Sequence, residues 1–189
     1  LQNNSSGTSN TAVGYNACLS GAATFANTGV GHRTLQANVS GANTALGFSA
    51  GANISSGARN TAVGAGALEN NVAPDDITGV GYLSLQNNAG VQNTAVGTQS
   101  LTTNTSGGNN TAVGYRALRL NTTASNNTAV GNSALHSCTS INNTAVGSSA
   151  LSSIGALSSN TAVGFGALQN ATTGNNNTAI GSNAIQLGV

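Results

Sequence analysis

The chain has 189 residues, of which only 4% are charged, and its formal net charge is +1. Such a chain, with no cluster of basic residues in its sequence, lacks the electrostatic surface that nucleic acids and anionic membranes attract, so we expect neither as a partner. Catalysis and metal binding use convergent sets of Asp, Glu, His, Cys or Lys, which this sequence does not offer. We therefore expect no enzyme activity, no metal and no cofactor. No apolar stretch is long enough to span a membrane, so direct membrane insertion is not expected either.

A five-residue phrase, most often Asn-Thr-Ala-Val-Gly, recurs eleven times along the chain. The copies are 16 or 17 residues apart and start at Asn10, Asn27, Asn43, Asn60, Ile77, Asn93, Asn110, Asn127, Asn143, Asn160 and Asn177. A period kept from one end to the other indicates that one small unit is stacked many times. We expect a single repeat domain over 1–189, with a partial coil at 1–9 and full coils from Asn10 to Val189. Because the chain begins within a repeat, we expect it to be a segment of a longer array.

The positions of the unit, numbered from the Asn, differ sharply in what they accept. Position two is always Thr, position five always Gly, position four always aliphatic, and positions three and eight are always small. Position nine is Leu in eight copies, whereas positions ten to seventeen vary and are rich in Asn, Ser, Thr and Gly. The invariant positions predict a structural ladder, represented by Thr11, Val13, Gly14, Thr61, Val63, Gly64, Thr111, Val113, Gly114, Leu118, Thr161, Val163, Gly164 and Leu168.

Thr-Ala-Val predicts a short strand in which Thr and Val share one face, and the Gly ends it by adopting positive φ or approaching a neighbour closely. Helical repeats need about 33 to 47 residues, so this unit is too short for one. We therefore expect an all-β fold, a β-solenoid of eleven coils about 4.8 Å apart, in which like residues stack. Val and Leu should form buried ridges, and Asn amides should pair down the stack.

From this assignment of faces we expect Asp substitutions to differ in their effect on stability. Asp at Val113 or Leu118 should bury an unpaired charge and melt the stack locally. Asp at Ser125, in the polar part of the coil, should be tolerated.

The phrase with its following Ala-Leu, as in residues 110–118, resembles the head repeats of YadA-type trimeric autotransporter adhesins. It is also similar to repeat arrays in phage and giant-virus fibre proteins. The resemblance implies a left-handed parallel β-roll, a homotrimer or longer fibre, and a location outside a cell, on its surface or on a virion. It also implies a host-surface protein or glycan as a partner. The unit is longer than the usual head repeat. We accordingly expect a non-enzymatic extracellular fibre or adhesin segment.

Position six holds most of the aromatic residues and should form an exposed or half-exposed corner, because it also accepts Ala, Thr, Asn and Ser. As a candidate surface-recognition file it contains Tyr15, His32, Phe48, Tyr82, Tyr115 and Phe165. Such rings could stack on sugars, or could cover a seam between chains. Arg33 and Arg116 lie beside the file and are interpreted as solvated charges.

The alternative function is ice binding through the Thr file, which resembles ice-binding solenoids. That function needs Thr ranks on an outward face, whereas here only one rank is regular and its Thr shares a face with an aliphatic residue that should be buried.

Glu69, Asp75 and Asp76 form the one acidic neighbourhood. They could bind calcium weakly or form a solvated bulge, and a tailspike that cleaves glycans would need a second carboxylate partner. Cys18 and Cys138 are too many coils apart for a disulfide within one chain, and Cys18 replaces a core Leu.

Overall fold

The computed structural model describes residues 1–20, 24–171 and 173–185. Within these ranges every repeat forms one short strand and no helix occurs, so the all-β expectation is confirmed. The last residues of the expected final coil, 186–189, lie outside the described residues. The strands are β1 (Thr11–Val13), β2 (Thr28–Val30), β3 (Thr44–Leu46), β4 (Thr61–Val63), β5 (Thr78–Val80), β6 (Thr94–Val96), β7 (Thr111–Val113), β8 (Thr128–Val130), β9 (Thr144–Val146), β10 (Thr161–Val163) and β11 (Thr178–Ile180).

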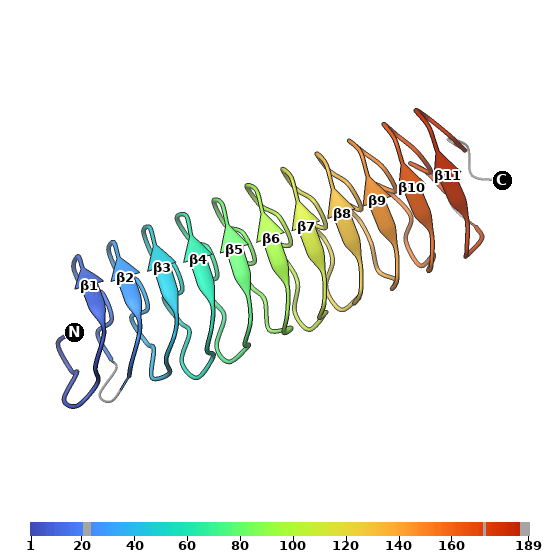
Figure 1. Ribbon diagram of the computed structural model, residues 1–189. Coiled ribbons are helices and arrows are strands. Elements are labelled where there is room, and N and C mark those ends of the chain that lie inside the picture. The colour runs from blue at the N-terminus through green and yellow to red at the C-terminus, as the bar shows by residue number, and fades with distance from the viewer. Residues whose placement is uncertain (21–23, 172, 186–189) are drawn as a thin grey trace.

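The strands form one parallel sheet in which the order along the chain is also the order in space. Like residues pair throughout, as in Thr111 with Thr128 and Val113 with Val130. Figure 1 shows the coils stacked into a rod, with the two ends of the chain at opposite ends. The expected β-solenoid is therefore confirmed. Its winding sense and its assembly into trimers stay predictions.

The interior of each coil is thin, and this decides which face of the strand is buried. A Cβ added at Gly79, in the position-three file, would lie 2.5 Å from Leu68 Cδ1. At Gly79 even a methyl group would displace this Leu side chain, and in other strands Ala fills the space completely, so nothing larger than a methyl group fits between the strand and the opposite limb. Accordingly Ala112 is fully buried in β7, whereas Thr111 and Val113 on either side are half-buried.

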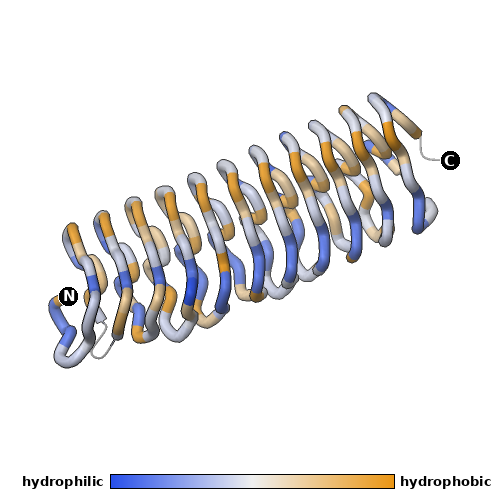
Figure 2. The backbone as a smooth tube through the Cα atoms, in the orientation of Figure 1, coloured by the Kyte–Doolittle hydropathy of each residue, from blue (hydrophilic) through white to orange (hydrophobic). Residues whose placement is uncertain are grey.

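Our expectation that the aliphatic residue at position four is buried is therefore wrong. These side chains share the outer face with Thr. Inner members such as Val96 and Val146 are 37% and 38% exposed, and the exposed fraction reaches 73% for Ile180 in the last strand. The ladder of like residues exists, but its Thr and Val ranks lie on the surface. Hydrophobic residues line up from coil to coil in Figure 2, with hydrophilic files beside them.

The core consists of positions three, eight and nine, exemplified by Ala112, Ala117 and Leu118, all fully buried. Position nine has a left-handed backbone in every coil, with φ between 46° and 57°. For a residue other than Gly this conformation costs about 1–2 kcal/mol. In exchange, the Leu118 N–H donates to the Ala134 carbonyl of the next coil at 3.0 Å. Each coil thus relies on its neighbour to offset backbone strain.

Asn side chains fill the polar half of the interior. At position one, Asn93 Oδ1 accepts the Asn110 N–H at 2.8 Å, while its Nδ2 donates to the Gly107 carbonyl at 2.7 Å. Asn104, at position twelve, donates to the same carbonyl at 2.7 Å. Most position-one amides therefore bind the backbone of the next coil rather than pairing with each other. Direct pairing at this position occurs near the C-terminal end, for example from Asn160 to Asn143 at 3.2 Å.

Position twelve is a buried file that the sequence analysis included among the freely varying positions. Its members are 5% exposed or less and comprise Asn38, Ile54, Asn71, Asn88, Asn104, Asn121, Cys138, Ile154 and Ala171. The file accepts Asn, Ile, Cys or Ala, so no single residue type marks it. What its members share is a side chain small enough to fit inside the coil.

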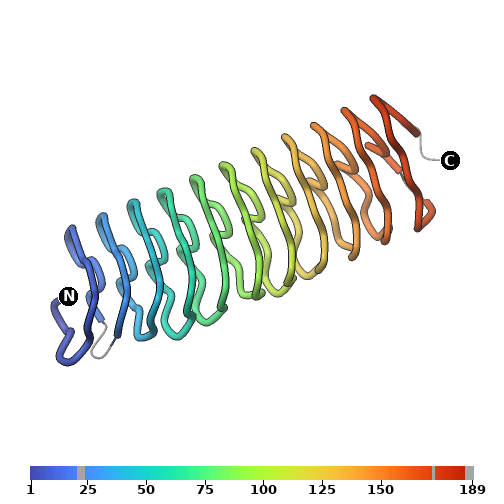
Figure 3. Tube along the Cα trace, viewed as in Figure 1, coloured from blue at the N-terminus to red at the C-terminus, as the bar shows by residue number. Residues whose placement is uncertain are grey.

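Coil length varies in a regular way along the chain, whose course from coil to coil Figure 3 traces. The coils that begin at Asn27, Ile77 and Asn127 are one residue shorter than those around them, so the pattern recurs every third coil. The missing residue lies just after position twelve. Asn88 Nδ2 reaches the carbonyl two residues on, at Gly90, whereas Asn104 reaches the one three residues on.

The Gly at position five is required by both its conformation and its surroundings. Gly114 has φ of 134°, and a Cβ there would lie 2.4 Å from the carbonyl oxygen of Gly131 in the next coil. The same close approach recurs between successive coils, which explains why this position admits only Gly.

We expect Gly114→Ala to lower the free energy of unfolding by at least about 2 kcal/mol, because backbone of the next coil must move. Gly155→Ala is the matched control, since Gly155 also has positive φ but no atom lies within 4 Å of its added Cβ. Thermal unfolding followed by circular dichroism measures both. Equal melting temperatures for the two variants would contradict the close-packing explanation.

Candidate interaction surface

The most extensive surface feature is the Thr–Val strip, defined as the side chains at positions two and four of β1 to β11. It is about 50 Å long and about 10 Å wide. None of its positions carries a charge. Its most exposed aliphatic members are Val13, Leu46, Val96, Val130, Val146, Val163 and Ile180. A strip of this size matches the largest apolar patches that monomers expose, and such patches are often functional, so it is the candidate interaction surface.

The expected aromatic corner lies immediately after the strip, beyond the position-five Gly. Three of its rings come together in the first coils. The Tyr15 and His32 ring centroids are 5.5 Å apart and those of His32 and Phe48 are 5.1 Å apart, with interplanar angles of 20° and 4°. All three side chains are exposed, so the expected placement at a corner is confirmed for them. They form a short stacked column at the N-terminal end of the rod.

The other three rings do not join this column. Tyr82, Tyr115 and Phe165 are 53%, 42% and 58% exposed, respectively. Small or polar residues occupy position six in the coils adjacent to each of them, so they remain single rings. Tyr115 is covered by the Arg116 guanidinium, whose Cζ lies 4.7 Å from the ring centroid. Arg116 therefore contacts a ring of the aromatic file. The sequence analysis interpreted Arg116 only as a solvated charge and did not predict this contact.

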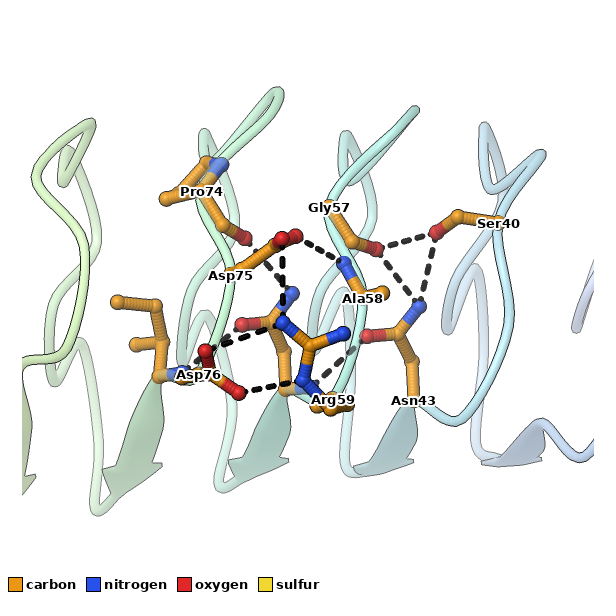
Figure 4. A network of polar contacts seen from close by, with 10 residues as sticks. Ser40, Asn43, Gly57, Ala58, Arg59, Pro74, Asp75 and Asp76 are labelled. Atoms are coloured by element: carbon orange, nitrogen blue, oxygen red, sulfur yellow. Dashed lines mark hydrogen bonds and ion pairs between the residues drawn. The ribbon is translucent and has the colours of Figure 1, made fainter.

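Two of the acidic side chains, Asp75 and Asp76, pair with the guanidinium of Arg59, as Figure 4 shows. Arg59 Nε donates to Asp76 Oδ1 at 2.6 Å, and its Nη2 donates to Asp75 Oδ2 at 3.2 Å. The Arg59 hydrogen bond holds the pKa of Asp76 below its ordinary value. Glu69 instead accepts a hydrogen bond from Gln86 Nε2. Within the described residues no group of three or more His, Cys, Asp or Glu could hold a metal ion, so the structure does not favour the calcium interpretation.

The sequence analysis missed a cluster of basic side chains on two adjacent coils. Arg116 and Arg119 belong to the coil of β7, and His136 belongs to the next coil at the same position as Arg119. The residues are separated by 3 and 17 positions, so they form no run in the sequence. The signal that could have found them is the repeat itself, because residues one period apart stack.

Both cysteines face the interior. Cys18 is 5% exposed and Cys138 is fully buried, and no disulfide joins them. Burial raises the pKa of both thiols. The expectation that Cys18 is a buried hydrophobic residue is confirmed, and neither thiol is presented to a second chain.

Comparison with known protein families, curated proteins and solved structures finds no match for this chain. In the part of the chain that the structure describes, no helix is present that could cross a membrane.

We expect both thiols to resist a thiol reagent such as Ellman's reagent in the native protein, with Cys138 reacting more slowly than Cys18. The reason is that the reactive thiolate is disfavoured by burial. Denaturant should release two thiols per chain at once. Rapid reaction of Cys138 in the native state would show that the coil opens locally at that position.

Proposed function

We propose that this chain is a rigid, non-enzymatic segment of an extracellular fibre, in which three copies pack their Thr–Val strips together about one axis. The assembled rod projects or itself forms an adhesive surface for a cell, matrix protein or glycan. The observation that carries the proposal is the Thr–Val strip, which places an uninterrupted aliphatic rank on the outside of a single chain.

Because the interior of the coil is thin, we favour a second copy of the chain as the partner that covers the strip. The coil has no room for Val beside Leu68 and its equivalents, so the aliphatic rank can be covered only from outside. A second copy offers the same length, spacing and uncharged chemistry. Three strips together amount to roughly 1,500 Å² in the whole trimer, or about 500 Å² for each pair of chains, so residues beside the strip must also contribute to reach the size of a specific interface. The resemblance to trimeric adhesin heads supports three chains and an extracellular location.

The aromatic corner supports an adhesive role because it repeats weak contacts along the rod. Rings at one edge of the strip are available to stack on sugars or to contact a protein partner. Copies displayed on three chains bind a multivalent surface more tightly than one copy does.

The first measurement is the mass of the folded protein by light scattering after size exclusion. We expect a value near three times the chain mass of 18.2 kDa. A stable monomer at all concentrations tested would contradict the proposal.

A set of Asp variants separates the interface from the core. We expect Val113→Asp to yield folded monomers, because the charge lies on the strip, with a change in monomer stability within about 1 kcal/mol. Leu118→Asp should lower the free energy of unfolding by more than about 3 kcal/mol, because the charge is buried without a partner. Mass and circular dichroism are measured on each variant.

Ser125→Asp is the matched control for these variants. Ser125 Oγ accepts the Gly108 N–H, and Asp75 Oδ1 accepts the Ala58 N–H at the equivalent position, so an Asp already serves this role in another coil. The control should stay trimeric and stable. If Val113→Asp also stayed trimeric, the strip would not be the interface.

Ice binding is a second candidate function, because the structure places the Thr of every strand on the outer face. A flat rank of hydroxyl and methyl groups at a regular spacing is the arrangement this function needs. Its test is thermal hysteresis, which the fibre proposal does not expect. Hysteresis that Thr111→Tyr reduces would favour ice binding over the fibre.

A further inference from the structure

Arg116, Arg119 and His136 form the basic patch, on the limb of the coil that follows Gly114 and not on the Thr–Val strip. The Arg119 N–H donates to the Arg116 carbonyl at 3.3 Å, so the two arginines lie one turn apart in the same coil. The Leu120 N–H donates to the His136 carbonyl at 2.9 Å, which places His136 directly beside Arg119 in the next coil. Adjacent coils are about 4.8 Å apart. Three basic side chains therefore meet on a chain that has few of them.

No acidic side chain balances the patch. Arg116 donates to the neutral Gln99 at 3.1 Å, and no ion pair of either arginine is found among the described residues. Glu69 shares the file of Arg119 but stands three coils away, roughly 14 Å along the axis. Arg59 differs from these two arginines, because it forms ion pairs with two carboxylates. The Nε of Arg119 is buried and has no hydrogen-bond partner, so no protein group neutralises this guanidinium from the inside.

Hydroxyl groups adjoin the patch. An open groove of about 190 Å³ begins at His136, and its lining residues are Ser133, His136, Ser149, Ser152 and Ser153. The Ser137 hydroxyl lies 3.1 Å from His136 Nδ1. Short hydroxyl side chains beside basic ones can bind sugar hydroxyls and an anionic substituent at the same time. The Tyr115 ring packs under the Arg116 guanidinium and so holds this charge beside the patch.

We propose that the basic patch and its serine groove bind an acidic polysaccharide, with the sulfate or carboxylate group held by Arg119, Arg116 and His136 and the sugar hydroxyls held by the serines. The site extends along the rod axis over three coils, so it suits a linear ligand. It deepens the adhesive part of the proposed function by naming a class of glycan and its site, yet it lies on another limb and does not need the strip to be an interface.

His136 makes binding depend on pH. Burial, together with the charges of Arg119 and Arg116, lowers the pKa of His136, so the ring is largely neutral near pH 7. The other groups around it are the hydroxyls of Ser133, Ser137, Ser149 and Ser152, which do not titrate. An anion beside the ring raises its pKa again, so ligand binding takes up a proton. Affinity should therefore rise as pH falls from about 7.5 to about 5.

The test is isothermal titration calorimetry of the purified native assembly with dextran sulfate, alginate, neutral dextran and inorganic sulfate at low salt. We expect an acidic polysaccharide to bind and neutral dextran not to bind. Sulfated dextran and alginate distinguish a sulfate from a carboxylate requirement. Inorganic sulfate binding as tightly as the polysaccharide, or neutral dextran binding equally well, would overturn the proposal.

Arg119→Gln should weaken polysaccharide binding by at least about tenfold, because a charge-assisted donor is lost. Arg33→Gln is the matched control, since it removes the same charge from an exposed Arg that bonds only a Gln. Equal losses in the two variants would mean that only net charge matters, which would overturn the site. His136→Gln should bind with little dependence on pH.

Ser152→Asp provides a second variant in case Arg119→Gln folds poorly. It places an acid next to His136 without removing a basic residue and should abolish binding. Light scattering on the same samples reports the oligomeric state. Loss of binding in an intact trimer concerns this site alone, whereas a wild-type monomer that still binds would reject the fibre proposal and keep this one.

Discussion

Hydrogen bonds between successive coils are the constraint on which the rest of this structure depends. Backbone N–H groups and Asn amides in one coil find their hydrogen-bond partners in the two adjacent coils, so neighbouring coils must keep the same path and spacing. Once the path is fixed, each position of the unit becomes a file that runs the length of the rod. Gly114 and its equivalents are then required where the backbones of two coils approach closely. A charged side chain at any position lies beside the residues at the same position in the two adjacent coils.

The sequence was sufficient to predict the strand, its Gly and the stacking, because invariant Thr and Gly report directly on backbone geometry. It misled us about the buried face, since Val is more hydrophobic than Ala and was therefore placed inside. The better signal was size. Position three accepts only Ala and Gly, as at Ala112 and Gly79, which is what a space one methyl deep requires. Restriction to small residues indicated burial more reliably than hydrophobicity did.

The buried file at position twelve and the basic patch could not be read from single positions. Asn104, Ile54 and Cys138 fill the same space through different chemistry, so no pattern of residue types marks the file. Arg119 and His136 meet because the fold places one coil on the next, and no other coil has Arg or His at this position. Features that depend on the unit were predictable from the repeat, whereas features that occur in one or two coils required the structure.

The direction of the inter-coil hydrogen bonds has a mechanical consequence. They run along the rod axis, so a pull on its ends opposes them one coil at a time instead of shearing many together. Left-handed residues such as Leu118 lose their compensation when the neighbouring coil leaves, which favours sequential release. Each coil set free adds roughly 60 Å of extended chain. A rod of this construction is expected to lengthen stepwise under tension rather than to part in a single event.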